Sequence, residues 1–327
     1  PFENNAIFNG FGGTCENNNT GDVITLYDEE AERWISSYMN FQGNTPGSFE
    51  CVAISQTSDP TGSWYRYAFE ISDTANNDYP KLGVGPDAYY SSYNMFDGGF
   101  TGGKVAAHDR DAMIDGEPDA TTILFGPNSN WFTLMPADID GPVPSPAPGG
   151  LFGQIAQDAF EIFELTPDFE NPDNSTFEQI ADLSTESFDS QLCDAFRGRC
   201  VPQPNGPDLE DLAGRLMQRL QFRDMGDYQA MVTNHTVDAD GEGTAGIRWY
   251  EFRDENENGD WEIYRQGTFA PDDGLNRWMG SIAMNQDGAI GLIYTVSSND
   301  KNPAIRYTGR PQGAPLGQMT FQEETII

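Results

Sequence analysis

Positive charge is what this sequence most lacks. Its 327 residues include 52 acidic side chains but only 17 lysines and arginines, and the net charge is −35. Lys81, Lys104 and Lys301 are its only lysines, so the sequence contains no basic cluster. A surface this acidic repels nucleic acid and anionic membranes, and we expect neither as a partner.

Several sequence signatures are missing as well. No apolar run approaches the roughly 18 residues of a membrane span, so membrane insertion is not expected. The two histidines, His108 and His235, are too isolated for a metal centre, and no phosphate-binding loop or Gly-x-Ser-x-Gly elbow occurs. The chain begins at Pro1 without a signal peptide, which favours a mature protein or part of a larger polypeptide or assembly. The acidity suits an extracellular, salt-rich or calcium-rich setting, or serves solubility alone.

Two similar segments predict a repeat. Arg223-Asp-Met-Gly226 precedes a run ending in Ala-Met, and Arg277-Trp-Met-Gly280 precedes another. Fainter copies begin near residues 22, 78 and 132, and residues 285–288 read as a tight hairpin turn. Short strands that recur about every 50 residues are typical of β-propeller blades.

We therefore predict an all-β fold, with one β-propeller domain over residues 1–327. We expect six blades of four-stranded antiparallel sheets, with seven as the alternative count and a β-sandwich as the competing fold. The predicted blade starts lie near residues 22, 78, 132, 226 and 280.

Two regions depart from the repeat. Residues 168–207 are rich in Asn, Pro, Asp and Ser, and we interpret them as an inter-blade loop insertion. Residues 208–220 carry leucines at helical spacing behind Asp208, a residue suited to capping, and predict a short helix.

The four cysteines, an even number, favour two disulfides in an extracellular protein. Four cysteines allow three pairings. Cys193 and Cys200 bracket a loop short enough to close on itself, which leaves Cys15 to pair with Cys51. The Cys193–Cys200 bond would hold together part of the predicted insertion.

Long segments of the sequence resemble a group of secreted bacterial proteins. The similar segments include residues 11–22, 51–67, 78–84, 234–237, 246–251, 277–284 and 304–310. The group is similar to sialidase-like, BNR-type β-propellers found in exported, cell-surface or adhesin-like polypeptides. The resemblance implies the fold and an extracellular or cell-surface location more than an activity. It also implies that the last blade is incomplete here, because the similar proteins continue past the equivalent of Arg310.

The residues from Thr57 to Trp64 resemble the sialidase Asp box. Asp59, Gly62 and Trp64 match its pattern, with one extra residue between Asp and Gly. In such turns the aspartate binds backbone amides and the tryptophan packs between blades. We therefore expect a structural role.

The segment Asp254–Asp260 matches the first half of a calcium loop. Oxygen ligands at Asp254, Asn256, Asn258 and Asp260 alternate along it, and Gly259 allows a sharp turn. Arg265 stands where an EF-hand has its bidentate glutamate, so an EF-hand is excluded and a Ca²⁺-binding hairpin remains, with an acidic β-turn as the alternative.

An enzymatic site of sialidase type would need an arginine clamp, a tyrosine nucleophile with a glutamate partner, and an acid. The candidates are Arg223, Arg277, Arg306, Tyr228 and Glu251. Arginines at repeated positions are explained more simply as links between blades, so we regard these residues as weak catalytic candidates.

The sequence thus favours a non-catalytic module, secreted or on the cell surface, that binds a polysaccharide or a surface protein. Its 13 tyrosines and 6 tryptophans suit stacking on sugars. The alternative function is a sialidase-like, glycan-cleaving enzyme, and a further alternative is a structural subunit of an extracellular assembly or filament.

Overall fold

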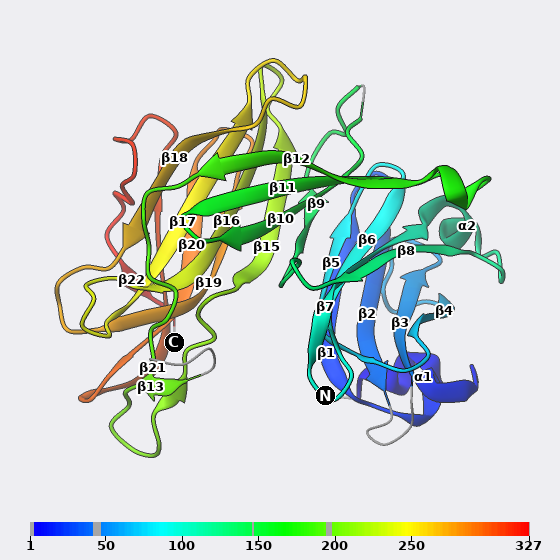
Figure 1. Cartoon of the computed structure of the whole chain (residues 1–327), viewed down its shortest axis with the longest axis horizontal. Coiled ribbons are helices and arrows are strands. Elements are labelled where there is room, and N and C mark those ends of the chain that lie inside the picture. Colours follow the sequence, from blue (N-terminus) through cyan, green and yellow to red (C-terminus); the bar gives the residue numbers. More distant parts are fainter. Residues whose placement is uncertain (1–2, 42–46, 146, 194–197, 327) are drawn as a thin grey trace. The chain divides into compact units, whose positions relative to one another are not determined.

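The structure is a computed structural model that describes residues 3–41, 47–145, 147–193 and 198–326 (Figure 1). The fold is all-β, as predicted. Helical segments are few and short: the 3₁₀ helices η1 (Asn4–Phe8) and η2 (Pro172–Asn174), and the α-helices α1 (Gly13–Asn17) and α2 (Arg110–Asp115). No helix within the described ranges is long and apolar enough to cross a membrane.

Most strands follow one another in antiparallel runs of four, here called meanders, in which sequence neighbours are also sheet neighbours. The first is β1 (Gly21–Asp28), β2 (Arg33–Phe41), β3 (Ser48–Ser55) and β4 (Trp64–Ser72), and the second is β5 (Asn76–Val84), β6 (Ala88–Phe96), β7 (Phe100–Asp109) and β8 (Thr122–Asn128). The third is β9 (Met135–Ile139), β10 (Gly150–Ala156), β11 (Ala159–Thr166) and β12 (Thr176–Ser184). The fourth is β15 (Leu216–Asp224), β16 (Gln229–Asp238), β17 (Ala245–Asp254) and β18 (Glu262–Phe269), and the fifth is β19 (Asn276–Met284), β20 (Ile290–Ser298), β21 (Lys301–Arg310) and β22 (Glu324–Thr325). A separate pair is formed by β13 (Arg199–Val201) and β14 (Leu209–Glu210).

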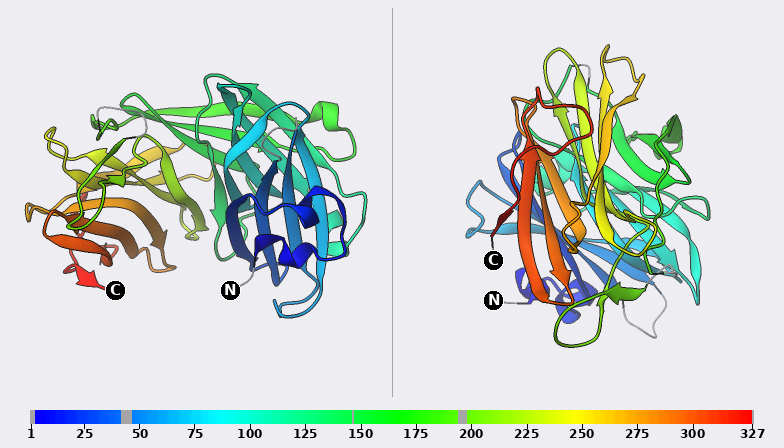
Figure 2. Two further views of the ribbon diagram at one scale, coloured as in Figure 1. Left: turned by 90° about the horizontal axis from the view of Figure 1, so that it is seen from below. Right: turned by 90° about the vertical axis from the view of Figure 1, so that its left-hand side faces the viewer.

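The chain forms two compact units. Unit 1 comprises Pro1–Phe152 and Phe163–Glu178, and unit 2 comprises Gly153–Ile162 and Gln179–Ile327. The first two meanders lie in unit 1 and the last two in unit 2, while the unit boundaries fall within β10, β11 and β12. Figure 2 shows the individual meanders as curled sheets.

A shared irregularity marks the first strand of three meanders. Asp22, Tyr79 and Met279 have left-handed φ values of 52°, 54° and 49°. In each case the strand register shifts at that point, as it does at a β-bulge. The repeat is therefore carried by the backbone even where the sequences differ.

The structure does not confirm the predicted six blades. Within the described ranges there are five meanders, and a sixth is absent from them. The predicted start near residue 226 is wrong, because Gly226 lies in the turn between β15 and β16, where Met225 N–H donates to Tyr228 O. Gly280, the counterpart of Gly226, lies inside β19, so the two Arg-x-Met-Gly segments are not structurally equivalent.

The predicted helix at 208–220 is also wrong. This segment contains β14 and the first part of β15, with Leu212 and Gly214 both at left-handed φ values. Leu216 and Leu220 are buried on one face of β15. A spacing of four residues fits a strand as well as a helix, which explains the error.

Both predicted disulfides are present. Cys15–Cys51 joins α1 to β3, and Cys193–Cys200 closes the short loop, of which residues 194–197 lie outside the described ranges. The first bond packs with Phe8 and Tyr38 in a small apolar cluster. The N-terminal helices are thereby fixed to the first meander.

Candidate functional site

A pocket of about 600 Å³ opens on unit 1. Its walls come from η1 and from the turn that joins β3 to β4. The lining residues are Ala6, Ile7, Pro60, Thr61, Gly62, Ser63, Trp64 and Arg66. The volume falls within the range of about 300–1,000 Å³ that is usual for small-molecule sites.

The Asp-box-like turn forms one wall of this pocket. Asp59 Oδ1 accepts hydrogen bonds from the Thr61 amide at 2.9 Å and the Thr61 hydroxyl at 2.7 Å, and these bonds lower the pKa of Asp59. The Trp64 indole donates to Pro60 O at 3.1 Å, and Gly62 N–H donates to Asp59 O at 3.2 Å. The turn therefore holds the indole ring in place at the pocket wall.

Among the described residues, Arg66 supplies the only charged side chain of the pocket lining. Its Nη1 donates to Asn9 O at 2.8 Å, and its guanidinium lies 5.6 Å from the centroid of the Phe11 ring. Nearby Glu16 does not line the pocket and accepts amide hydrogen bonds from Gly10 and Gly12, which lower its pKa. The guanidinium is thus oriented by neutral groups, with most of its donors left for a ligand.

A second polar cluster lies in unit 1, where β1, β3 and β5 approach one another. It contains Asp22 on β1, Glu50 on β3, and Asn77 and Lys81 on β5. Asn77 Nδ2 lies 3.4 Å from Glu50 Oε2, while Glu50 Oε1 and Asn77 Oδ1 have no hydrogen-bond partner among the described residues. Lys81 Nζ donates to Pro80 O at 2.7 Å.

Burial sets the chemistry of Glu50. The side chain is 1% exposed, and burial raises its pKa to about 8, although a hydrogen bond from Ser37 and the charge of Lys81 act in the opposite direction. The charge of Asp22 raises the pKa further. Glu50 is therefore a protonated carboxylic acid at neutral pH, and the Asp22 side chain that acts on it is exposed.

The structure brings together two of the three predicted arginine candidates, Arg277 and Arg306. Arg277 Nε lies 2.8 Å from Glu323 Oε1, and its Nη2 lies 2.7 Å from Asp273 Oδ2. Arg306 forms an ion pair with the same Glu323. Arg223 lies on β15, in register with Ala230 of β16. Arg277 and Arg306 thus link β19 and β21 to the C-terminal segment.

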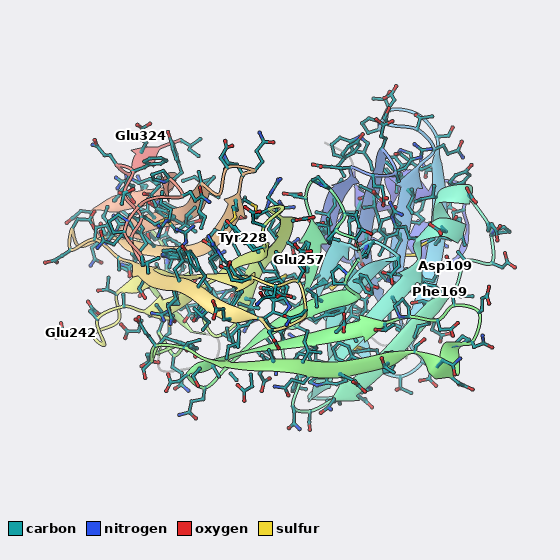
Figure 3. All side chains as sticks on the ribbon, turned by 90° about the horizontal axis from the view of Figure 1, so that it is seen from above. Asp109, Phe169, Tyr228, Glu242, Glu257 and Glu324 are labelled. Carbon is teal, nitrogen blue, oxygen red and sulfur yellow. A yellow bond between two sulfur atoms is a disulfide. The ribbon has the colours of Figure 1, made fainter. Side chains whose placement is uncertain are left out.

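Glu251 is fully buried and held by two other arginines. Arg253 Nε lies 2.8 Å from its Oε1, and Arg265 pairs with its Oε2. The Arg253 guanidinium lies 3.8 Å from the centroid of the Tyr228 ring, which is labelled in Figure 3. The arrangement satisfies both oxygens of Glu251 and stacks Tyr228 on a cation, as expected of a structural network.

The predicted calcium loop joins β17 to β18, with Glu257 at its tip (Figure 3). Asp254 accepts the amide of Asn256 at 3.2 Å and that of Gly259 at 2.7 Å, and Asn258 Nδ2 donates to Asp260 Oδ2 at 2.9 Å. These oxygens stabilise the turn itself. Over the described ranges, one group of possible metal ligands lies close enough together to hold an ion: Cys193, Cys200 and Asp211. Its two sulfur atoms form a disulfide.

The two histidines are buried, and the Nε2 atom of each lies within hydrogen-bond distance of a hydroxyl group. His108 Nε2 lies 2.8 Å from Ser91 Oγ, which in turn lies 2.6 Å from the Tyr93 hydroxyl. His235 Nε2 lies 3.0 Å from the Tyr250 hydroxyl. Burial lowers the pKa of each histidine to about 3, so both are neutral and inaccessible.

Sequence reasoning missed Arg66, Glu50 and Lys81. Arg66 falls two residues after the recognised turn, and alternation along β4 could have placed it beside Trp64. No local pattern distinguishes Glu50 from the other acidic residues, because its environment is created by strands from two meanders.

Comparisons with known proteins were made for the sequence and the structure. No protein-family model matches the sequence, and no curated protein matches it. Among solved structures, the endo-arabinase from Bacteroides thetaiotaomicron VPI-5482 is 13% identical with a TM-score of 0.41, over 91% of this chain and 95% of that chain. The GH43 endo-arabinanase from Bacillus licheniformis is 9% identical with a TM-score of 0.39, over 87% and 92%.

The endo-1,4-β-xylanase from Bacteroides thetaiotaomicron VPI-5482 is 12% identical with a TM-score of 0.38, over 94% of this chain and 95% of that chain. These printed names describe glycan-cleaving enzymes. At these TM-scores the structural similarity does not indicate what this chain does.

Proposed function

We propose that this protein is an extracellular β-propeller of five blades that binds polysaccharide chains. The observation that carries the proposal is the pocket that combines the indole of Trp64 with the guanidinium of Arg66. Sugar rings present C–H faces that stack on aromatic rings, and their hydroxyl groups accept hydrogen bonds from arginine. The two disulfides support an oxidising, extracellular location.

Affinity electrophoresis in gels containing arabinan, xylan, pectin or a sialylated glycan tests this function. We expect at least one polysaccharide to retard the wild-type chain. The Trp64→Ala variant should lose the retardation, and Ser63→Trp, which fills the pocket from an exposed position, should lose it too. Unretarded migration of the wild-type protein in every gel would refute the proposal.

Trp34→Ala is the matched control. Trp34 lies on the neighbouring strand β2, and its indole also donates to a carbonyl of the same loop, Ser58 O at 3.1 Å. It does not line the pocket. Loss of retardation in this variant as well would indicate a general effect of the loop rather than sugar stacking.

A second candidate function, glycan cleavage, is favoured by the pair Asp22 and Glu50. A protonated acid beside a carboxylate is the combination by which glycosidases protonate the leaving oxygen and activate water or attack the sugar. In this hypothesis Glu50 donates the proton and Asp22 is the base or nucleophile. Because Glu50 is buried, its carboxyl group must become accessible when the substrate binds.

Released reducing ends, measured in the same polysaccharide solutions, test cleavage. Asp22→Asn and Glu50→Gln should each lower the rate by at least about a hundredfold, as is usual for an acid–base group. Asp97→Asn, an exposed acid in the turn after β6, is the control. Retardation without released ends would leave binding as the function and reject cleavage.

Calcium binding at the loop of Asp254 remains a further proposal. The alternating oxygens support it, although Asp254 already accepts two amides. Calorimetric titration with CaCl₂ should show heat for the wild-type chain that Asp254→Asn removes. Equal, negligible heats for both would reject the site.

A further inference from the structure

The pocket at Trp64 contrasts in charge with the rest of the molecule. The chain contains 52 acidic residues, but none of the eight residues that line the pocket is acidic, and one is an arginine. A neutral sugar gains no electrostatic binding energy from this difference in charge. An anionic ligand does, because the one charged side chain among the described lining residues is a cation, and Asp59 of the adjoining turn is engaged by Thr61.

From this contrast we infer that the pocket takes a uronic acid residue of an acidic polysaccharide. This inference rests on the proposed polysaccharide binding and assigns the class of sugar. The carboxylate would pair with Arg66, whose planar fork of donors matches a carboxylate in two parallel hydrogen bonds. The ring of the same sugar would lie against Trp64.

The surroundings of Arg66 suit this role. Only its Nη1 has a hydrogen-bond acceptor among the described residues, Asn9 O, which fixes the guanidinium plane without neutralising its charge. The Phe11 ring lies 5.6 Å from the guanidinium and steadies it further. Glu16 accepts hydrogen bonds from Gly10 and Gly12, and the charge of Arg66 is a smaller cause of its lowered pKa.

The Asp-box-like turn supplies the remaining specificity. The exposed hydroxyl groups of Thr61 and Ser63 lie at the pocket wall, where they can exchange hydrogen bonds with sugar hydroxyls. Asp59 keeps the Thr61 hydroxyl oriented. A turn with a structural role thus also forms one side of a ligand site.

Isothermal titration calorimetry with trigalacturonate and with its fully methyl-esterified form tests the inference, because esterification removes the negative charge and keeps the sugar rings and their hydroxyl groups. We expect wild-type protein to bind the acid at least tenfold more tightly, with the advantage shrinking as salt rises. Arg66→Gln should abolish the preference, and Arg66→Lys should keep only part of it. Arg33→Gln, on β2 and outside the pocket, should leave it unchanged.

The outcomes separate the two proposals. Equal affinity for the acid and its ester in wild-type protein would overturn the uronate assignment and leave polysaccharide binding intact. Binding of neither would overturn the assignment, and absence of retardation in every gel would then remove the proposed function too. The comparison of the two ligands on wild-type protein needs no variant to fold.

Discussion

Glu50 shows how a side chain acquires its chemistry from neighbours that the sequence does not reveal. It lies in β3, a strand that is buried along most of its length, where it contacts Asn77 of β5. The charges of Asp22 and Lys81 also act on its pKa. Only the approach of strands from two meanders produces this environment. The Asp59 turn is the opposite case, because its hydrogen bonds span a few residues and were predictable from the sequence.

The buried acid predicts an unusual pH dependence. The folded pKa of Glu50 lies near 8, above the ordinary 4.5 of the unfolded chain. Its contribution to stability is therefore fully present below pH 4.5 and is lost as the pH rises toward 8, at up to about 1.4 kcal/mol per pH unit. Urea unfolding of wild type and Glu50→Gln between pH 5 and 8 should show the variant gaining relative stability as the pH rises. A constant difference would contradict the assignment.

Neither histidine is expected to titrate near its ordinary pKa in the folded protein. Because burial holds the pKa of His108 and His235 near 3, neither should protonate above pH 5 in the folded protein. Their imidazole C–H resonances in NMR spectra should stay constant between pH 5 and 8. A sigmoidal shift with a midpoint near 6.5, the ordinary value, would show that at least one ring is accessible. Since the depressed pKa values favour the neutral folded form, their stabilising contribution should be lost as the pH falls below 6.5.

The presence of strands could be predicted from the sequence, but the strand boundaries and the pairing between strands were harder to predict. The turn at 285–288 was located correctly because Asn285 and Gly288 form a tight turn, with Gly288 N–H donating to Asn285 O. The leucines of 208–220 fit a helix and a strand equally, and burial decided for the strand. The two Arg-x-Met-Gly segments gave a wrong blade start because Gly226 lies in a turn, whereas Gly280 lies in a strand.

The two disulfides should differ in what they contribute. Cys15 and Cys51 are 36 residues apart, and Cys193 and Cys200 are 7 apart. Chain-entropy arguments give about 4 kcal/mol for the longer loop and about 2 kcal/mol for the shorter. Denaturant unfolding of the two paired Cys→Ala variants should show the larger loss for Cys15/Cys51. Equal losses, or a larger loss for Cys193/Cys200, would contradict this account.

The molecule as a whole combines strong acidity with a repeat of four-stranded meanders. Composition was enough to predict an all-β chain. The number of meanders was not predictable, because the shared feature is a left-handed residue at a bulge, filled by Asp22, Tyr79 or Met279. These side chains share no chemistry, although the predicted starts near residues 22, 78, 132 and 280 coincide with the first strands β1, β5, β9 and β19. The pocket joins residues from η1 and from the β3–β4 turn, which lie far apart in sequence.

Retardation of two tryptophan variants in polysaccharide gels shows whether polysaccharide binds in the pocket at Trp64. Trp64 and Trp34 each donate an indole hydrogen bond to the same loop, but only Trp64 lines the pocket. The account predicts that Trp64→Ala abolishes retardation by the polysaccharide that retards the wild-type chain, while Trp34→Ala preserves it. Unchanged retardation of Trp64→Ala would show that polysaccharide binds elsewhere and would contradict the assignment of this pocket.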